Sequence, residues 1–235
     1  MRLTLSSEDG TRARSVVWMV VAIAGGGGKI GRRLARLLAA NGDSALSLIR
    51  RPEQADEIRA EGIEPVICDL EQASVDEVAE AIRSADAIVF AAGAGPGSGP
   101  ERKETMDYGG AVKLIAAAKA NGIARYVMVS SMGANPDAPG DDTFNVYQRA
   151  KGRADAELAA SGLDHTIVRP GQLTDAPGTG LVNAGESVGR SEIPREDVAA
   201  SLLAVLHEPG TAGLTFELIA GDTPITEALA QLAGS

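Results

Sequence analysis

The sequence predicts an α/β fold of the Rossmann type, a doubly wound parallel sheet with helices on both faces. Three observations lead to this fold class. Short apolar segments alternate with amphipathic helical patterns along nearly the whole chain. The first apolar segment, residues 16–24, is rich in β-branched residues and runs directly into a glycine-rich turn. The segment after the turn carries Ile30, Leu34, Leu37 and Leu38 at helical spacing.

The remaining strands are predicted from short apolar runs, and the remaining helices from amphipathic spacing. Strands of a parallel sheet are buried on both faces, so they are continuous apolar runs bounded by turn residues. By this criterion we expect strands over residues 16–24, 45–49, 63–68, 87–91, 125–130, 165–168 and 214–219. The predicted helices begin or end beside glycine or other turn residues. We expect them over residues 30–41, 53–60, 75–82, 108–120, 146–160 and 197–206.

The chain is expected to hold one domain. Residues 1–15 are polar and have no hydrophobic period, so we expect a flexible N-terminal extension there. Residues 16–235 contain no repeat and no linker, and we expect them to form a single domain. Basic residues before the apolar run at 16–24 are also compatible with a secretory signal sequence, and Met19 leaves a translation start within the run open. The run is too short to span a bilayer, and the turn after it favours a buried strand.

The composition restricts the partners. Acidic residues outnumber basic ones 32 to 22, which gives a net charge of −10. Such a surface repels phosphate backbones and anionic lipids, so we expect no nucleic-acid and no membrane partner. We expect a cytoplasmic protein, a monomer or small homo-oligomer, that acts on a small molecule. One cysteine, Cys68, excludes an intramolecular disulfide, and with two histidines, His165 and His207, we expect no metal site.

The glycine-rich turn predicts a dinucleotide site. Gly25, Gly28 and Gly31 stand at GxxGxxG spacing, directly after a strand and at the start of a helix. Such glycines allow a tight turn, a close approach of the backbone to a diphosphate, and tight packing of the helix on the sheet. The helix N-terminus offers free N–H groups and the positive end of its dipole. We therefore place a diphosphate beside this turn, with Gly27 in its middle.

The residues after the next two strands favour NADP(H) over NAD(H). An acidic residue normally follows the second strand and binds the ribose 2′-hydroxyl of NAD. This chain has Arg50 and Arg51 there, and guanidinium groups suit a 2′-phosphate. Asp69 and Leu70 follow the third strand, where they are expected to lie near the adenine.

A second motif predicts acid–base chemistry. Tyr147 and Lys151 stand four residues apart on a predicted helix and so share one face. A lysine ammonium beside a phenol favours the phenolate form, which exchanges protons with a substrate. Ser130 and Ser131 stand at the C-terminal end of the fifth predicted strand, where a hydroxyl would polarise a substrate carbonyl. A packing tyrosine beside a surface lysine is the structural alternative.

Several segments together resemble the atypical short-chain dehydrogenase/reductases, in particular the NAD(P)-binding, NmrA-like and biliverdin-reductase-B-like branch. The resemblance rests on AGGGGKIG (24–31), Asp69-Leu70, VFAAGAG (89–95), YVMVSSMGA (126–134), YQRAK (147–151), GLDHTIVRPGQLTD (162–175), IPREDVAASLLAVL (193–206) and TFELIAGDTPITEAL (215–229). It implies a Rossmann fold with a small C-terminal substrate cap. It also implies a catalytic set of Ser131, Tyr147 and Lys151. The cofactor contacts that it implies are Gly25, Gly28, Lys29, Ile30, Arg50, Asp69, Leu70, Ala92, Gly93, Lys151 and Pro170.

These features predict an NADP(H)-dependent oxidoreductase that transfers hydride between the nicotinamide and a small carbonyl-type substrate. Epimerase or dehydratase chemistry uses the same parts, and a non-catalytic NADP(H)-sensing regulator is a further alternative. Residues 93–100 follow the fourth strand, at the edge where ligands bind in open α/β sheets, and are expected to form a mobile wall over the nicotinamide. Residues 133–145 and 174–195 are expected to line the substrate pocket.

Overall fold

A nine-stranded sheet forms the centre of the computed structural model, which describes residues 18–95 and 97–234. Its strands are β1 (Val20–Ala24), β2 (Ser44–Ile49), β3 (Glu64–Ile67), β4 (Ala87–Phe90), β5 (Arg125–Val129), β6 (Asp164–Pro170), β8 (Leu181–Gly185), β10 (Thr215–Ala220) and β11 (Thr223–Pro224). Their order in space is β11-β8-β10-β6-β5-β4-β1-β2-β3. The predicted extension 1–15 and the start of the predicted strand 16–24 lie outside the described residues.

The order of the strands confirms the predicted doubly wound fold. From β3 to β10 all neighbouring strands are parallel, and the order reverses between β1 and β4. In such sheets ligands bind at the carboxyl edge, at the point of reversal. The sequence did not predict the antiparallel edge formed by β8 and β11, nor the separate parallel pair of β7 (Gln172–Thr174) and β9 (Glu192–Pro194). These short strands hold the C-terminal region beside the end of β6.

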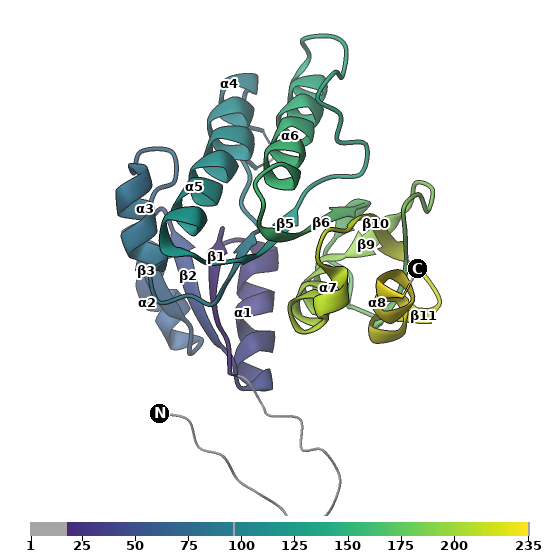
Figure 1. Ribbon diagram of the computed structural model, residues 1–235, viewed down its shortest axis with the longest axis horizontal. Helices are drawn as coiled ribbons and strands as arrows, with labels where there is room; N and C mark the ends of the chain where they lie inside the picture. Colours follow the sequence, from purple (N-terminus) through teal and green to yellow (C-terminus); the bar gives the residue numbers. More distant parts are fainter. Residues whose placement is uncertain (1–17, 96, 235) are drawn as a thin grey trace, which may run out of the picture.

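The helices cover both faces of the sheet (Figure 1). One face is covered by α1 (Lys29–Asn41), α2 (Ala55–Ala60), α7 (Arg195–His207) and α8 (Ile225–Ala233). The other face is covered by α3 (Val75–Ile82), α5 (Ala111–Asn121) and α6 (Thr143–Ala159). A short helical segment, α4 (Pro100–Arg102), and a π-helical segment, η2 (Lys103–Gly110), lead into α5. Two 3₁₀ turns, η1 (Pro52–Gln54) and η3 (Pro209–Thr211), complete the helical elements of the described chain.

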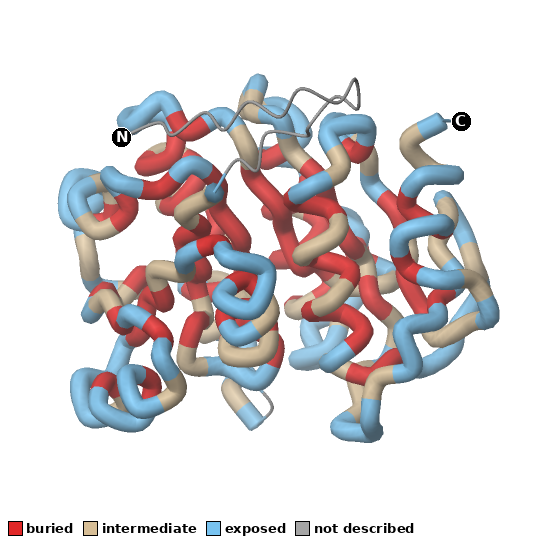
Figure 2. Tube along the Cα trace, turned by 90° about the horizontal axis from the view of Figure 1, so that it is seen from below, coloured by how far each residue is buried: buried red, intermediate tan, exposed pale blue. Residues whose placement is uncertain are grey.

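Each face of the sheet has its own apolar core. Alternate residues of β1 show the division, because Val21 and Ile23 pack under α1 and α7, whereas Ala22 and Ala24 pack under α5. Side chains of a strand point alternately to the two faces of the sheet. Because helices cover both faces, both sets of side chains are fully buried. Figure 2 shows the buried strands through the middle of the molecule and exposed outer turns of helices around them.

Two helices end at the glycines where the sequence predicts their ends. One helix begins earlier than predicted, because a side chain caps its first turn. The helices α1 and α5 end at Gly42 and Gly122, both in the left-handed conformation, as predicted. The predicted helix 146–160 in fact begins at Thr143, because Asp142 accepts hydrogen bonds from the backbone N–H groups of Phe144 and Asn145. That additional turn places Phe144 beside the predicted catalytic helix residues.

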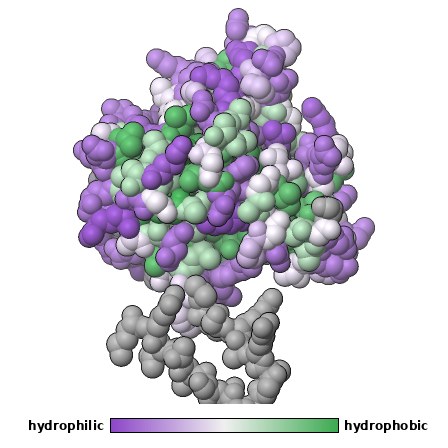
Figure 3. All heavy atoms as spheres, in the orientation of Figure 1, coloured by the Kyte–Doolittle hydropathy of each residue, from purple (hydrophilic) through white to green (hydrophobic). Residues whose placement is uncertain are grey.

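The outer surface is mixed in character. On the face seen in Figure 3, hydrophobic residues form small groups separated by hydrophilic side chains. No helix within residues 18–95 and 97–234 is long and apolar enough to cross a membrane.

Candidate cofactor and active site

The glycine turn after β1 packs so closely that side chains are excluded from it. Gly25 has a φ of +82°, and a Cβ there would lie 2.8 Å from the backbone of Ala92. A Cβ on Gly31 would collide with the carbonyl oxygen of Gly25. Gly28 precedes the first residue of α1 and has no side chain to cap the helix. The N–H groups of the first helical turn lack intrahelical acceptors and face outward beside the turn, which suits a diphosphate.

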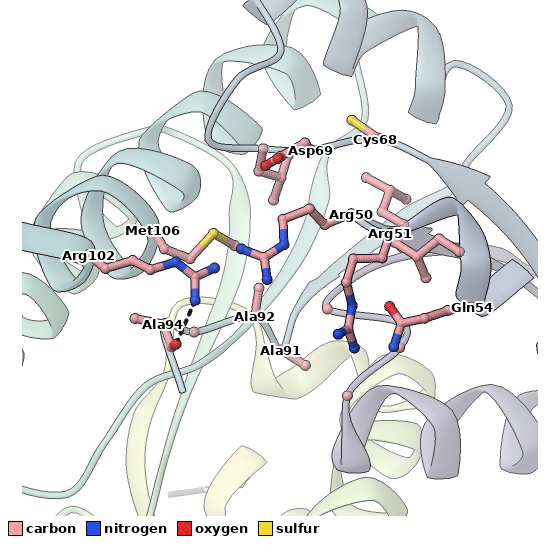
Figure 4. A pocket seen from close by; sticks show the side chains of 17 residues that line it. Arg50, Arg51, Gln54, Cys68, Asp69, Ala91, Ala92, Ala94, Arg102 and Met106 are labelled. Atoms are coloured by element: carbon pink, nitrogen blue, oxygen red, sulfur yellow. Dashed lines mark hydrogen bonds between the residues drawn. The ribbon is translucent and has the colours of Figure 1, made fainter. Parts of the chain in front are cut away.

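Beside this turn lies a cavity of about 330 Å³, here called the arginine cavity. Its walls come from the turn itself, the end of β2, the segment after β3 and the loop after β4. Most of the predicted cofactor residues meet here, namely Gly25, Gly27, Gly28, Arg50, Arg51, Asp69, Leu70, Ala92 and Gly93. The structure adds Gln54, Arg102 and Met106, which the sequence did not predict. Figure 4 shows the guanidinium groups of Arg50 and Arg102 reaching into the cavity from opposite sides.

Glu71 holds these two arginines at the wall of the arginine cavity. Its Oε2 accepts hydrogen bonds from Nε and Nη2 of Arg102 at 3.0 and 2.8 Å, and it lies 3.5 Å from Nη1 of Arg50. Thr105 donates to the other carboxylate oxygen at 2.7 Å. Partial burial raises the pKa of Glu71, but the hydrogen bonds and the two positive charges outweigh burial, so the net pKa is below its usual value. The carboxylate is therefore ionised at neutral pH.

A larger cavity of about 740 Å³, here called the tyrosine cavity, adjoins the arginine cavity across Gly28, Ala92 and Gly93. It brings together four predicted residues that are far apart in the sequence, Lys29, Ile30, Tyr147 and Lys151. The two cavities form one continuous trough along the carboxyl edge of the sheet. A dinucleotide has the length and the two-ended shape for such a trough.

Two buried lysines lie on the tyrosine cavity. Nζ of Lys151 donates to the carbonyl oxygen of Val129 at 3.1 Å and lies 3.4 Å from Oδ1 of Asp107. Nζ of Lys103 lies 5.4 Å from the centre of the Tyr147 ring. The sequence motif predicted Lys151 but gave no indication of Lys103 or Asp107. Both lie on η2, and a π-helical turn of this kind often occurs at functional sites.

The same side chains hold the loop that follows β4. Asp107 accepts a hydrogen bond from the N–H of Ala94 at 3.1 Å, and Lys103 donates to the carbonyl oxygen of Gly95 at 3.0 Å. Arg102 donates to the carbonyl oxygen of Ala94 at 2.9 Å. The predicted wall 93–100 is therefore tied to η2 at its first residues, while Pro96 lies outside the described residues.

The two serines after β5 lie on different cavities. Ser130 lies on the tyrosine cavity with Tyr147 and Lys151. Ser131 and Pro170 lie on a neighbouring cavity of about 520 Å³, here called the distal cavity. Phe144 lies on both cavities, so they meet at its ring. The role of Ser131 beside Tyr147 stays a prediction, and the Oγ of Ser130 is buried beside Asp155.

An acidic residue of the C-terminal region pairs with two cationic residues that line the tyrosine cavity. Asp175 binds Nζ of Lys29, the first residue of α1, and Nη1 of Arg195, the first residue of α7, at 2.5 and 2.9 Å. The hydrogen bond from Lys29 lowers the pKa of Asp175 despite a small opposing effect of desolvation, and the charge of Arg195 adds to the lowering. Residues from the predicted pocket segment 174–195 thus meet the cofactor turn.

Comparison with known proteins supports the dinucleotide site. The model of a protein family described as NAD(P)H-binding matches residues 25–209. The uncharacterized sugar epimerase YhfK of Bacillus subtilis (strain 168) is 41% identical over 215 residues, which cover 91% of this chain and 100% of YhfK.

Two solved structures share the fold. A putative NAD-dependent epimerase/dehydratase from Bacillus halodurans has 38% sequence identity and a TM-score of 0.84, covering 91% of this chain and 99% of its own. ChuY, an anaerobillin reductase from Escherichia coli O157:H7, has 26% identity and a TM-score of 0.73, covering 86% and 98%. These similarities confirm the predicted fold class and the resemblance to the atypical short-chain dehydrogenase/reductases.

The ion pairs of Glu71 predict a dependence of stability on pH. The pKa of Glu71 is lower in the folded protein than in the unfolded chain, so protonation favours unfolding. The contribution of Glu71 to the free energy of unfolding is complete above the pKa of the unfolded chain, about 4.3. It is lost as the pH falls through the lower pKa of the folded protein. We expect Glu71→Gln to lower the melting temperature at pH 7, and the difference from wild type to shrink as the pH approaches 3. Thermal melts of both proteins between pH 7 and pH 3 at low salt measure this difference in melting temperature. The exposed Glu186→Gln variant is the control, and a difference that stays constant with pH would contradict the assignment.

Proposed function

Because the chain belongs to the NAD(P)H-binding family, we propose that it is an NADP(H)-dependent oxidoreductase acting on a small carbonyl-type substrate. One observation carries this proposal. Tyr147 and Lys151 of α6 share a cavity with Lys29 and Ile30, the residues at the start of the helix that faces the glycine turn. A proton donor and the end of a dinucleotide site therefore meet in one space.

The residues of the trough fit a phosphorylated dinucleotide. The glycine turn leaves a space beside the first turn of α1 that suits the diphosphate, since Gly28 has no side chain there. Arg50, Arg51 and Arg102 line the arginine cavity, and two carboxylates only partly balance them: Asp69 on the cavity wall, and Glu71, which is paired with Arg50 and Arg102. The Oδ1 atom of Asp69 already accepts a hydrogen bond from the N–H of Glu71 at 3.0 Å. This excess of guanidinium groups supports a 2′-phosphate rather than a free ribose hydroxyl.

The protein side chains supply proton transfer and charge stabilisation. NADP(H), when bound, supplies or accepts the hydride. Tyr147 gives a proton to the substrate oxygen during reduction and takes one during oxidation; within residues 18–95 and 97–234 its hydroxyl has no hydrogen-bond partner, so it is free for this exchange. Lys103 and Lys151 place positive charge beside the developing oxyanion. The Oγ of Ser130 is buried beside Asp155, so Ser131 is the serine whose hydroxyl contacts the substrate, from the distal cavity.

Lys151 has a further role in positioning. An ammonium group has three donors; Lys151 uses one of them on the carbonyl oxygen of Val129 and forms an ion pair with Asp107 at 3.4 Å. A free donor therefore remains for a ribose hydroxyl of the dinucleotide. Because the pair with Asp107 is buried, removing Lys151 also leaves an unpaired carboxylate inside the protein, at a cost of about 3–5 kcal/mol in stability. Loss of activity in a Lys151 variant therefore does not isolate catalysis.

Epimerase or dehydratase chemistry is the second candidate. It is favoured by the similarity to YhfK and to the Bacillus halodurans protein, whose names describe an epimerase and an epimerase/dehydratase. Both reactions need the same hydride position and the same proton donor, with the cofactor restored within one cycle. Net oxidation of NADPH by a carbonyl substrate supports the reductase; isomerisation with a constant NADPH concentration supports the epimerase.

Removing the Tyr147 hydroxyl tests the catalytic role. We expect Tyr147→Phe to lower kcat by about 10²–10⁴-fold, the usual contribution of a positioned acid–base group. Its affinity for NADPH should stay unchanged because the diphosphate and adenosine contacts remain. Oxidation of NADPH with a panel of small aldehydes, ketones and quinones measures kcat. Tyr108→Phe, at a tyrosine on η2 whose hydroxyl binds Glu157, is the matched control. Full turnover by Tyr147→Phe would remove the residue from the mechanism.

Removing the Arg50 guanidinium tests the cofactor preference. We expect Arg50→Ala to weaken NADPH binding by about tenfold, as for the loss of one hydrogen bond to a charged group, and to leave NADH binding unchanged. Equilibrium titrations with the two reduced cofactors measure both affinities. Arg59→Ala, at an exposed arginine of α2 paired with Asp56, is the control. Equal affinities of the wild type for NADPH and NADH would refute the preference for NADP(H).

A further inference from the structure

The tyrosine cavity is lined by more cations than anions. Four basic side chains line it, those of Lys29, Lys103, Lys151 and Arg195, against one carboxylate, that of Asp107. The chain as a whole carries a net charge of −10, so this local excess of positive charge is opposite in sign to the rest of the molecule. A cleft lined by one sign of charge concentrates ligands of the other sign. The cavity therefore favours an anionic ligand.

Ion pairs within the protein account for three of these four cations. Asp175 pairs with both Lys29 and Arg195, and the cavity's own carboxylate pairs with Lys151. Lys103 forms no ion pair with any residue that the structure describes. Since the other three cations already have a carboxylate, the unmatched positive charge of the cavity is that of Lys103.

The ammonium group of Lys103 is buried and retains free donors. The residue is 8% exposed. Its Nζ donates to the carbonyl oxygen of Gly95 at 3.0 Å and lies 5.4 Å from the centre of the Tyr147 ring. An ammonium group has three donors, so two remain after the bond to Gly95. A buried charge without an opposite charge is costly, and an anion that accepts these two donors offsets that cost.

The neighbours of the Lys103 ammonium place it in the wall of the cavity, beside the proposed proton donor. Gly95 and Tyr147, the two residues that it contacts, both line the tyrosine cavity. None of these three residues lines the arginine cavity, where we place the 2′-phosphate, and the diphosphate has its own place at the first turn of α1. The anion beside Lys103 therefore belongs to the substrate, and it lies close to the carbonyl group that Tyr147 protonates.

The walls of the cavity away from the lysines are mainly apolar. Ile30, Val129, Phe144 and Leu173 line them. Apolar walls of this kind suit an aliphatic or aromatic group, because they offer it no hydrogen-bond partner and exclude water from it. The ligand that fits this cavity thus has one anionic group near its carbonyl and an apolar remainder.

We propose that the substrate is a 2-oxo acid, a carbonyl compound that carries a carboxylate on the adjacent carbon and an apolar tail. Lys103 donates to the carboxylate and to the neighbouring carbonyl oxygen, the same oxygen to which Tyr147 gives its proton. The carboxylate itself is unchanged by the reaction. The position of the carbonyl at Tyr147 rests on the proposed function, whereas the binding of the carboxylate by Lys103 does not.

Binding of 2-oxo acids and of their neutral amides tests this assignment. The probes are pyruvate, 2-oxobutyrate and phenylglyoxylate, each compared with its own primary amide, which has the same number of heavy atoms and no charge. Titration of protein NMR resonances in the presence of NADP⁺, which has no hydride to give, measures the dissociation constants without turnover. We expect at least one acid to bind about tenfold more tightly than its amide, the change expected for a hydrogen bond between charged groups. Acids that bind no more tightly than their amides would overturn the proposal.

Variants of Lys103 assign the preference to its ammonium group. Lys103→Met removes the charge from a side chain of similar length, so it should weaken the bound acid by about tenfold and leave the affinity for the amide unchanged. Lys103→Arg restores a cation and should recover part of the affinity for the acid. Lys119→Met, at an exposed lysine of α5, is the control and should bind the acid as the wild type does. An unchanged affinity for the acid in Lys103→Met, or an equal loss for acid and amide, would refute the assignment. The comparison of acid with amide in the wild type needs no variant, so it holds even if Lys103→Met disturbs the loop after β4.

Tyr147→Phe separates the binding of the acid from the proposed catalysis. This variant keeps the ring beside Lys103, so it should bind the acid as the wild type does while turnover is lost. Normal binding of the acid together with full turnover would remove the catalytic role of Tyr147 and support the carboxylate site. Lost turnover in Tyr147→Phe, with no preference of the wild type for acids over amides, would overturn the carboxylate site and leave the catalytic role intact.

Discussion

The close packing of the glycine turn on the neighbouring strand ends is the constraint on which the whole site depends. A Cβ on Gly25 would collide with the loop after β4, one on Gly26 with Ser47 of β2, and one on Gly31 with the turn itself. The turn therefore joins the carboxyl ends of three parallel strands and the start of α1 within a few ångströms. This contact makes the arginine and tyrosine cavities one trough, because both include the turn and the loop after β4.

A second constraint is electrostatic. The chain has a net charge of −10, yet its trough is lined by cations. Arg102 is paired with Glu71, Lys151 with Asp107, and Lys29 with Asp175. These pairs hold long side chains in fixed positions before any ligand arrives, which lowers the ordering cost of binding an anion. The same pairs link the segment after β3 to α4, η2 to α6, and α1 to the C-terminal region around the trough.

The sequence predicts the parts of the site that depend on local pattern. The spacing of the glycines, the arginines after β2 and the Tyr147–Lys151 pair all follow from residue type and position, and the structure gathers them at one sheet edge. Lys103 and Asp107 were not predicted, because the π-helical turn that directs them to the site has no periodic signal in the sequence. The resemblance predicts Ser131 as the catalytic serine, but which cavity its side chain lies on depends on tertiary structure, and Ser131 lies on the distal cavity rather than with Tyr147. Glu71 and Arg102 meet only through tertiary packing of the loop after β3 on α4 and η2.

A crystal structure with bound NADP⁺ would show whether the trough is a dinucleotide site with its reacting end at Tyr147. We expect the diphosphate at the first turn of α1, the 2′-phosphate beside Arg50, and the nicotinamide in the tyrosine cavity with the Tyr147 hydroxyl facing it. A dinucleotide bound outside the trough, or a nicotinamide placed away from Tyr147, would show that the trough is not the reaction site.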